Sequence, residues 1–192
     1  MAMLTLSTGE AVKNEPLRQK ALSQGQECLF CGYASPLNPL FFKDGDTSNI
    51  HDNNIAVADS VCLAWQQLNT LTFDSATLAY LPGLAAQDIN HLQRTLLAAM
   101  DDAQYRDTAI SLLNWLSSHQ RCVEEAWGTA HPQAFAQVLR QLPSAFKDKV
   151  HGFWQGIAVI VHPKRIANPL KNNLLETTTR WWSALYQDYK AR

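Results

Sequence analysis

The feature that most constrains the fold is a pair of cysteines, Cys28 and Cys31, which are separated by two residues and followed by Gly32. This C-x2-C spacing lets one tight turn direct two thiolates at a single tetrahedral metal, with backbone amides pointing at the sulfurs. A second pair of ligands must then come from elsewhere in the chain. Asp59 and Cys62 repeat the same spacing, with an aspartate in the first position. The sequence therefore predicts a structural zinc (Zn2+) site with three cysteine ligands and one aspartate.

The fourth ligand of this site has alternatives. Asp59 is also compatible with a solvated acid, and His51, in the loop before it, is a rival ligand. Cys122 is a further rival, although its place in a helical pattern favours a core residue. A thioredoxin-like redox role for Cys28 and Cys31 would need a βαβ unit around the pair, and the surrounding sequence does not predict one.

Charge and hydropathy limit the classes of partner. The net charge is −1, from 16 Lys and Arg against 17 Asp and Glu, so no general attraction to nucleic acid or anionic lipid is expected. No apolar run reaches the roughly 18–20 residues that span a bilayer. The N-terminus also lacks the basic region and apolar core of a secretory signal. We expect a cytoplasmic protein without direct membrane insertion, where close cysteines favour metal over a disulfide.

Residues 1–72 are predicted to form a small metal-bound module. A short helix is expected over residues 15–26, and residues 37–43 predict a strand that enters a β-hairpin through the turn sequence DGD. Asn54 is expected to cap a helix over residues 55–68, which carries the last two candidate ligands on one face. The predicted order is the cysteine turn at residues 28–31 (the knuckle), then the hairpin, then the helix, which is a ββα-metal arrangement.

Residues 73–192 are predicted to be mostly helical and to pack on this module. Residues 72–81 predict a strand, which a Pro-Gly pair stops. The apolar spacing and the capping residues then predict helices over residues 85–102, 105–127, 132–142, 144–160 and 170–189. The predicted fold class is α+β, and mostly α overall.

Two adjacent tryptophans, Trp181 and Trp182, lie in the last predicted helix. Neighbours on a helix point about 100° apart, so both cannot face one core. One of them is expected at a partner surface, and the alternative is that both are half-buried in a broad apolar face.

Several short motifs occur in an order that resembles a known family. They are the knuckle CLFCGY, the LF-x-x-DGD turn, the segment NNIAVADSVC, then LAYLPGL, VEEAWG and PQAFAQVL, together spanning roughly residues 27–142. On these motifs the chain resembles the IcmJ/DotN family of Dot/Icm (type IVB) secretion systems. That family has a degenerate version of the HNH-nuclease ββα-metal fold.

The resemblance implies a structural zinc held by two C-x2-C pairs. Cys28 and Cys31 match the first pair, and Cys62 matches the last cysteine of the second. Asp59 falls where the family has a cysteine, so a hard oxygen replaces a soft thiolate and weaker zinc binding is expected. The resemblance also implies an adaptor in the coupling complex. It would dock on a DotL-like coupling ATPase and other subunits, and be recruited to the inner-membrane face through them.

No enzymatic activity is expected. HNH chemistry needs a histidine general base at the end of the first strand and a metal-binding histidine on the helix. The first predicted strand ends at Lys43 without a histidine, and Leu63 stands where an active helix often has one. The alternative function is a metal-dependent HNH-type nuclease with a rearranged site that uses His51.

Overall fold

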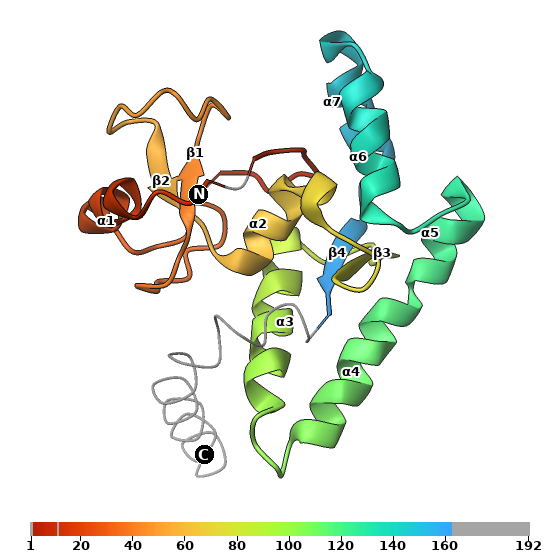
Figure 1. Ribbon diagram of the computed structural model, residues 1–192. Helices are drawn as coiled ribbons and strands as arrows, with labels where there is room; N and C mark the ends of the chain where they lie inside the picture. The colour runs from red at the N-terminus through yellow and green to blue at the C-terminus, as the bar shows by residue number, and fades with distance from the viewer. Residues whose placement is uncertain (1, 11, 163–192) are drawn as a thin grey trace.

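The computed structural model describes residues 2–10 and 12–162, which form an α+β structure with two small antiparallel sheets (Figure 1). The predicted fold class is confirmed at this level, and the HNH-like character of the first module remains a prediction. Within the described ranges, no helix is both long and apolar enough to cross a membrane. The predicted helix over residues 170–189, with Trp181 and Trp182, lies outside the described residues.

A hairpin packed on a helix forms the first structural unit. Helix α1 (Glu15–Gln24) lies beside strands β1 (Leu40–Phe42) and β2 (Ile55–Val57), which pair antiparallel with Phe41 opposite Ala56. The side chain of Asn14 caps α1 by accepting a hydrogen bond from the Leu17 amide. A small separate core fills the space between these elements, made of Ala21, Leu22, Leu40, Phe42, Ile55 and Val57.

The predicted helix over residues 55–68 is wrong at its start. Residues 55–57 form β2, and helix α2 covers only Ser60–Gln66. The β-branched Ile55 and Val57 are both buried when they pair with β1, which a helix would not allow at this spacing. Asn54 closes the hairpin loop instead of capping a helix, because its side chain accepts from the Asp44 amide at 3.0 Å.

The second sheet joins two strands that are far apart in the sequence. Strand β3 (Ala76–Tyr80) pairs antiparallel with β4 (Ile157–Val161), with Leu78 opposite Val159. Between these two strands the chain forms, in order, the helices α3 (Ala86–Ala99), α4 (Arg106–Ser118), α5 (Gln120–Trp127), α6 (Pro132–Gln141) and α7 (Ser144–Phe153). A short 3-10 helix, η1 (Leu68–Thr70), precedes β3.

Two further predicted helices differ from the observed ones. The helix expected over residues 144–160 ends at Phe153, and Gly156, at φ 84°, turns the chain into β4. All five residues of β4 are buried, and a short continuous apolar run is compatible with either a buried strand or a helix. The helix expected over residues 105–127 is interrupted at His119, which separates α4 from α5.

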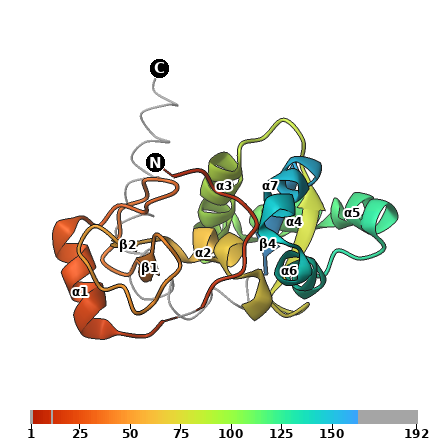
Figure 2. The ribbon, with the colours of Figure 1, turned by 90° about the horizontal axis from the view of Figure 1, so that it is seen from above.

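A single main core connects the hairpin side of the molecule to the second sheet. Helix α2 lies between the two in the view from above (Figure 2), and it contacts η1, α3 and β4. Cys62, Leu68, Leu78 and Val159 all belong to this core and are fully buried. This core packs the described parts of residues 1–72 and of residues 73–192 together. The division into two domains between residues 72 and 73 remains a prediction.

The side chain of Gln93 attaches α3 to the second sheet. Its Nε2 donates to the Val159 carbonyl at 2.9 Å, and its Oε1 accepts from the Val161 amide at 2.8 Å. The amide group thus occupies the free edge of β4 as a neighbouring strand would. This contact places α3 beside both the sheet and α2, which carries one of the predicted metal ligands (Figure 1).

Candidate metal centre

The C-x2-C pair forms the tight turn that its spacing predicts. The Cys28 amide donates to the Tyr33 carbonyl at 2.9 Å, and the Gly32 amide donates to the Cys28 carbonyl at 2.9 Å. Gly32 has φ 73°, a left-handed conformation that favours glycine. The Phe30 amide points at the Cys28 Sγ at 3.4 Å. The turn therefore directs both cysteines to one side and offers a backbone donor to a sulfur.

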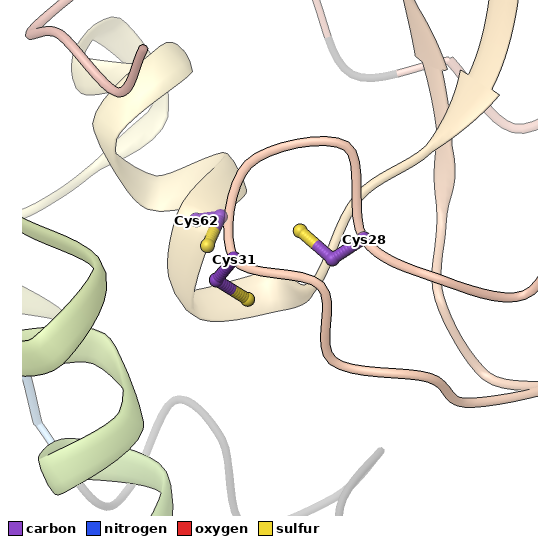
Figure 3. Close-up of side chains that lie close together, drawn as sticks. All are labelled: Cys28, Cys31 and Cys62. Atoms are coloured by element: carbon purple, nitrogen blue, oxygen red, sulfur yellow. The ribbon is translucent and has the colours of Figure 1, made fainter. Parts of the chain in front are cut away.

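Cys62 reaches the same point from helix α2. The Leu29 amide donates to the Val57 carbonyl at 3.0 Å, which holds the turn over the chain segment that enters α2. Figure 3 shows the three cysteine side chains converging, two from the turn and one from the helix. The Sγ atoms of Cys28, Cys31 and Cys62 all lie within 4.8 Å of one another.

The geometry of the three thiols is compatible with zinc. Zn–S bonds of about 2.3 Å place the sulfurs of a tetrahedral site about 3.8 Å apart. From the observed limit of 4.8 Å, the sulfurs must approach one another by about 1 Å at most. All three cysteines are free thiols and are buried. Soft, buried and converging donors of this kind suit a closed structural zinc site better than a hard-cation site.

The pKa values of the three thiols are shifted in different directions. Hydrogen bonds from the Cys31 and Cys62 side chains hold the pKa of Cys28 far below its usual value. The same bond to Cys28 raises the pKa of Cys31, and hydrogen bonds to the other two cysteines together with burial raise the pKa of Cys62. A metal that binds all three as thiolates must therefore displace the protons of Cys31 and Cys62.

Asp59 lies beside the thiols, but its carboxylate has another partner. It occupies the N-cap position of α2, is buried, and makes no side-chain hydrogen bond to the helix. Its Oδ2 instead accepts from Nη2 of Arg94 in a buried ion pair. Nη2 is also 3.4 Å from the Cys31 Sγ, so Arg94 links the carboxylate to the cluster, but Asp59 is not among the residues whose ligand atoms lie within 4.8 Å of one another. Its role as the fourth ligand remains a prediction.

The two rival ligands lie elsewhere. His51 is exposed in the loop between β1 and β2, and Cys122 is exposed on α5. The expected core position of Cys122 is therefore wrong, and Val123 is the buried residue of α5, since it lies seven residues after Leu116 on the same helical face. Across residues 2–10 and 12–162, the three cysteines form the only group of at least three potential ligands that lie this close together.

Sequence reasoning missed the residues of α3 that face the cluster. Asn90 and Arg94 are buried and contact Cys62 and Cys31, respectively. In the same helix Ile89 and Leu96 are buried, whereas Leu92 is 38% exposed. The sequence offered one signal for these residues. Long polar side chains lie between the apolar ones in this helix, and the apolar spacing alone does not explain their presence.

No protein-family model matches the chain, and no curated protein matches it significantly. The resemblance to the IcmJ/DotN family thus rests on the short motifs of the sequence.

Proposed function

We propose that this chain is a non-enzymatic, zinc-stabilised adaptor, in which one structural Zn2+ joins the cysteine turn to helix α2. The observation that carries this proposal is the convergence of three buried thiols from two separate segments. Cys28, Cys31 and Cys62 would hold the metal, and Asp59 would complete a tetrahedral set. When bound, the metal supplies a cross-link and folding free energy, not a reactive centre.

The position of the site supports a structural role. The turn carrying Cys28 and Cys31 packs on the start of α2, and α2 belongs to the main core. A metal here would tie the hairpin unit to the rest of the molecule. The three sulfurs are enclosed, whereas a catalytic zinc keeps one position open to water or substrate.

The surface supports an interaction role. Tryptophan is enriched among the residues that carry binding energy at protein interfaces. Trp115 on α4 is 55% exposed, and Phe153 at the end of α7 is 74% exposed. Other large apolar side chains that are more than one-third exposed include Leu112, Trp127, Val138 and Phe146.

The partner that we propose is the one implied by the family resemblance. The chain would dock on a DotL-like coupling ATPase and on other subunits of a type IV coupling complex, at the cytoplasmic side of the inner membrane. There it would help to assemble the platform that receives substrates. The small net charge of −1 supports a protein partner over nucleic acid.

The first test is metal content, measured by ICP-MS on the purified chain and on Cys31→Ser. We expect about one zinc per chain in the unmodified protein, because the site can hold a single tetrahedral ion. Cys31→Ser should lose the metal, whereas Cys122→Ser, an exposed cysteine on α5, is the matched control and should retain it. A folded protein without metal would refute the zinc-stabilised part of the proposal.

The second test addresses the partner. The zinc-loaded chain should retain the coupling ATPase of its own secretion system in a co-purification, and Cys31→Ser should retain less of it. A folded, zinc-loaded chain that fails to retain the ATPase would contradict the adaptor role. Cleavage of plasmid DNA with Mg2+ or Mn2+ that His51→Ala abolishes would instead establish the nuclease alternative.

A further inference from the structure

One face of α3 points polar side chains at the cysteine cluster. Asn90 and Arg94 are one helical turn apart and therefore share this face. Asn90 is fully buried, and Arg94 is 5% exposed. Burying an amide and a guanidinium is costly unless both are satisfied, so the partners of these two side chains indicate what they are for.

Each partner of Arg94 lies at the predicted metal site. Its Nη2 pairs with Asp59 and is 3.4 Å from the Cys31 Sγ, and its guanidinium lies 4.1 Å from the centre of the Tyr33 ring. Burial disfavours the charged guanidinium, but the carboxylate of Asp59 and the sulfurs outweigh this and raise the pKa of Arg94. Arg94 is therefore a fixed positive charge beside the thiols.

His91 extends this contact to the backbone of the cysteine turn. Nη1 of Arg94 lies 3.0 Å from Nδ1 of His91, and Nε2 of His91 lies 3.1 Å from the Cys31 carbonyl. Since arginine only donates, Nδ1 must accept, and the proton of the imidazole is on Nε2. Arg94 thus holds Cys31 both through its sulfur and, by way of His91, through its carbonyl.

The orientation of the Asn90 amide is determined by Trp65. The indole Nε1 of Trp65 lies 3.0 Å from Oδ1 of Asn90, and an indole nitrogen only donates. The atom that it meets must be the amide oxygen, which leaves the NH2 group facing the cluster. That Nδ2 lies 3.2 Å from the Cys62 Sγ, and a donor at this position favours the thiolate.

We propose that Arg94 and Asn90 are positioning residues of the zinc site. Three thiolates and one carboxylate around Zn2+ leave two uncompensated negative charges, and the guanidinium of Arg94 cancels one of them. Arg94 also pairs with Oδ2 of Asp59, which leaves Oδ1 as the oxygen that Asp59 would offer to the metal. Asn90 orients the Cys62 thiolate. The inference rests on the metal centre of the proposed function and assigns its charge balance to α3.

The test compares zinc affinity, measured by chelator competition, with the absorption spectrum of the Co2+-substituted protein. Loss of a residue that orients metal ligands typically weakens binding by about 10- to 100-fold. We expect a loss of this size in Arg94→Met and in Asn90→Leu. The Co2+ spectrum should also change in Arg94→Met, because Asp59 is no longer held. Arg106→Met, on the exposed side of α4, removes the same charge and should match the unmodified protein.

A double variant separates positioning from simple stability. Arg94→Met leaves a buried carboxylate without its counter-charge, which destabilises the fold by itself. The variant Arg94→Met with Asp59→Asn removes both charges, and it should fold yet bind zinc about 10- to 100-fold more weakly than Asp59→Asn alone. If the double variant binds zinc as tightly as Asp59→Asn alone, the ion pair is only structural and the inference is overturned.

The remaining outcomes distinguish this inference from the proposal on which it rests. If the unmodified chain binds no zinc, the metal centre fails and the role of α3 fails with it. If the unmodified chain binds zinc, and folded Arg94→Met and Asn90→Leu keep both its affinity and its Co2+ spectrum, only the role of α3 is refuted. The metal centre would then stand without support from α3.

Discussion

Replacing Gln93 by methionine should strongly destabilise the protein. The side chain is fully buried and satisfies two backbone groups of β4, the Val159 carbonyl and the Val161 amide. Methionine has a similar volume but cannot make either hydrogen bond. Each buried backbone group left without a partner costs about 1–3 kcal/mol, so the free energy of unfolding should fall by about 2–6 kcal/mol.

This loss is large enough to measure by both heat and denaturant. In a chain of this length, 1 kcal/mol shifts Tm by about 2–4 °C, so Tm should fall by about 4–24 °C. Urea unfolding followed by circular dichroism gives the free energy directly. Gln137→Met is the matched control, because Gln137 is exposed in the middle of α6, and its effect should be within about 0.5 kcal/mol.

A change of less than about 0.5 kcal/mol in Gln93→Met, at an unchanged denaturant slope, would refute this reasoning. It would mean that the edge of β4 is satisfied without α3. The position of α3, and with it the approach of Asn90 and Arg94 to the cysteines, would then need another explanation.

Three further predictions concern the metal. With free zinc at about 1,000 times its Kd, removing it costs about 4 kcal/mol. A chelator should therefore lower Tm by about 8–16 °C, as measured by differential scanning fluorimetry, and leave that of Cys31→Ser unchanged. Zinc affinity should fall as pH falls, because the raised pKa values of Cys31 and Cys62 make zinc displace their protons. Chelator competition at several pH values measures this, and a zinc affinity that does not change with pH would contradict it. Asp59→Ala should bind zinc more weakly than the unmodified chain but not lose it in ICP-MS, and an unchanged affinity would exclude Asp59 as a ligand.

The predictions that succeeded depend on short stretches of sequence. The helix expected over residues 15–26 is observed as α1 (Glu15–Gln24), because a proline in the first turn acts locally. The tight turn at Cys28 and Cys31 is also local, since its hydrogen bonds and the positive φ of Gly32 lie within a few residues. That Cys62 would join this pair followed from ligand chemistry, which requires further donors for any metal held by two cysteines.

The predictions that failed depend on partners that are distant in the sequence. Residues 157–161 form a strand because β3 is available to pair with them, and no pattern inside an apolar run distinguishes this from a buried helix. Residues 55–57 likewise become a strand by pairing with β1.

The same reason applies to the surroundings of the cysteines. The identities of the thiols are visible in the sequence, but the side chains that face them come from α3, a helix whose rotation depends on contacts with β4 and α2. Arg94 and Asn90 are polar residues in an amphipathic helix, and only the packed fold shows that both are buried against sulfur. Local sequence specifies turns, caps and ligand types, because these depend on neighbouring residues. The pairing of distant strands and the charge next to a buried site depend on the whole core, and therefore appear only in the folded chain.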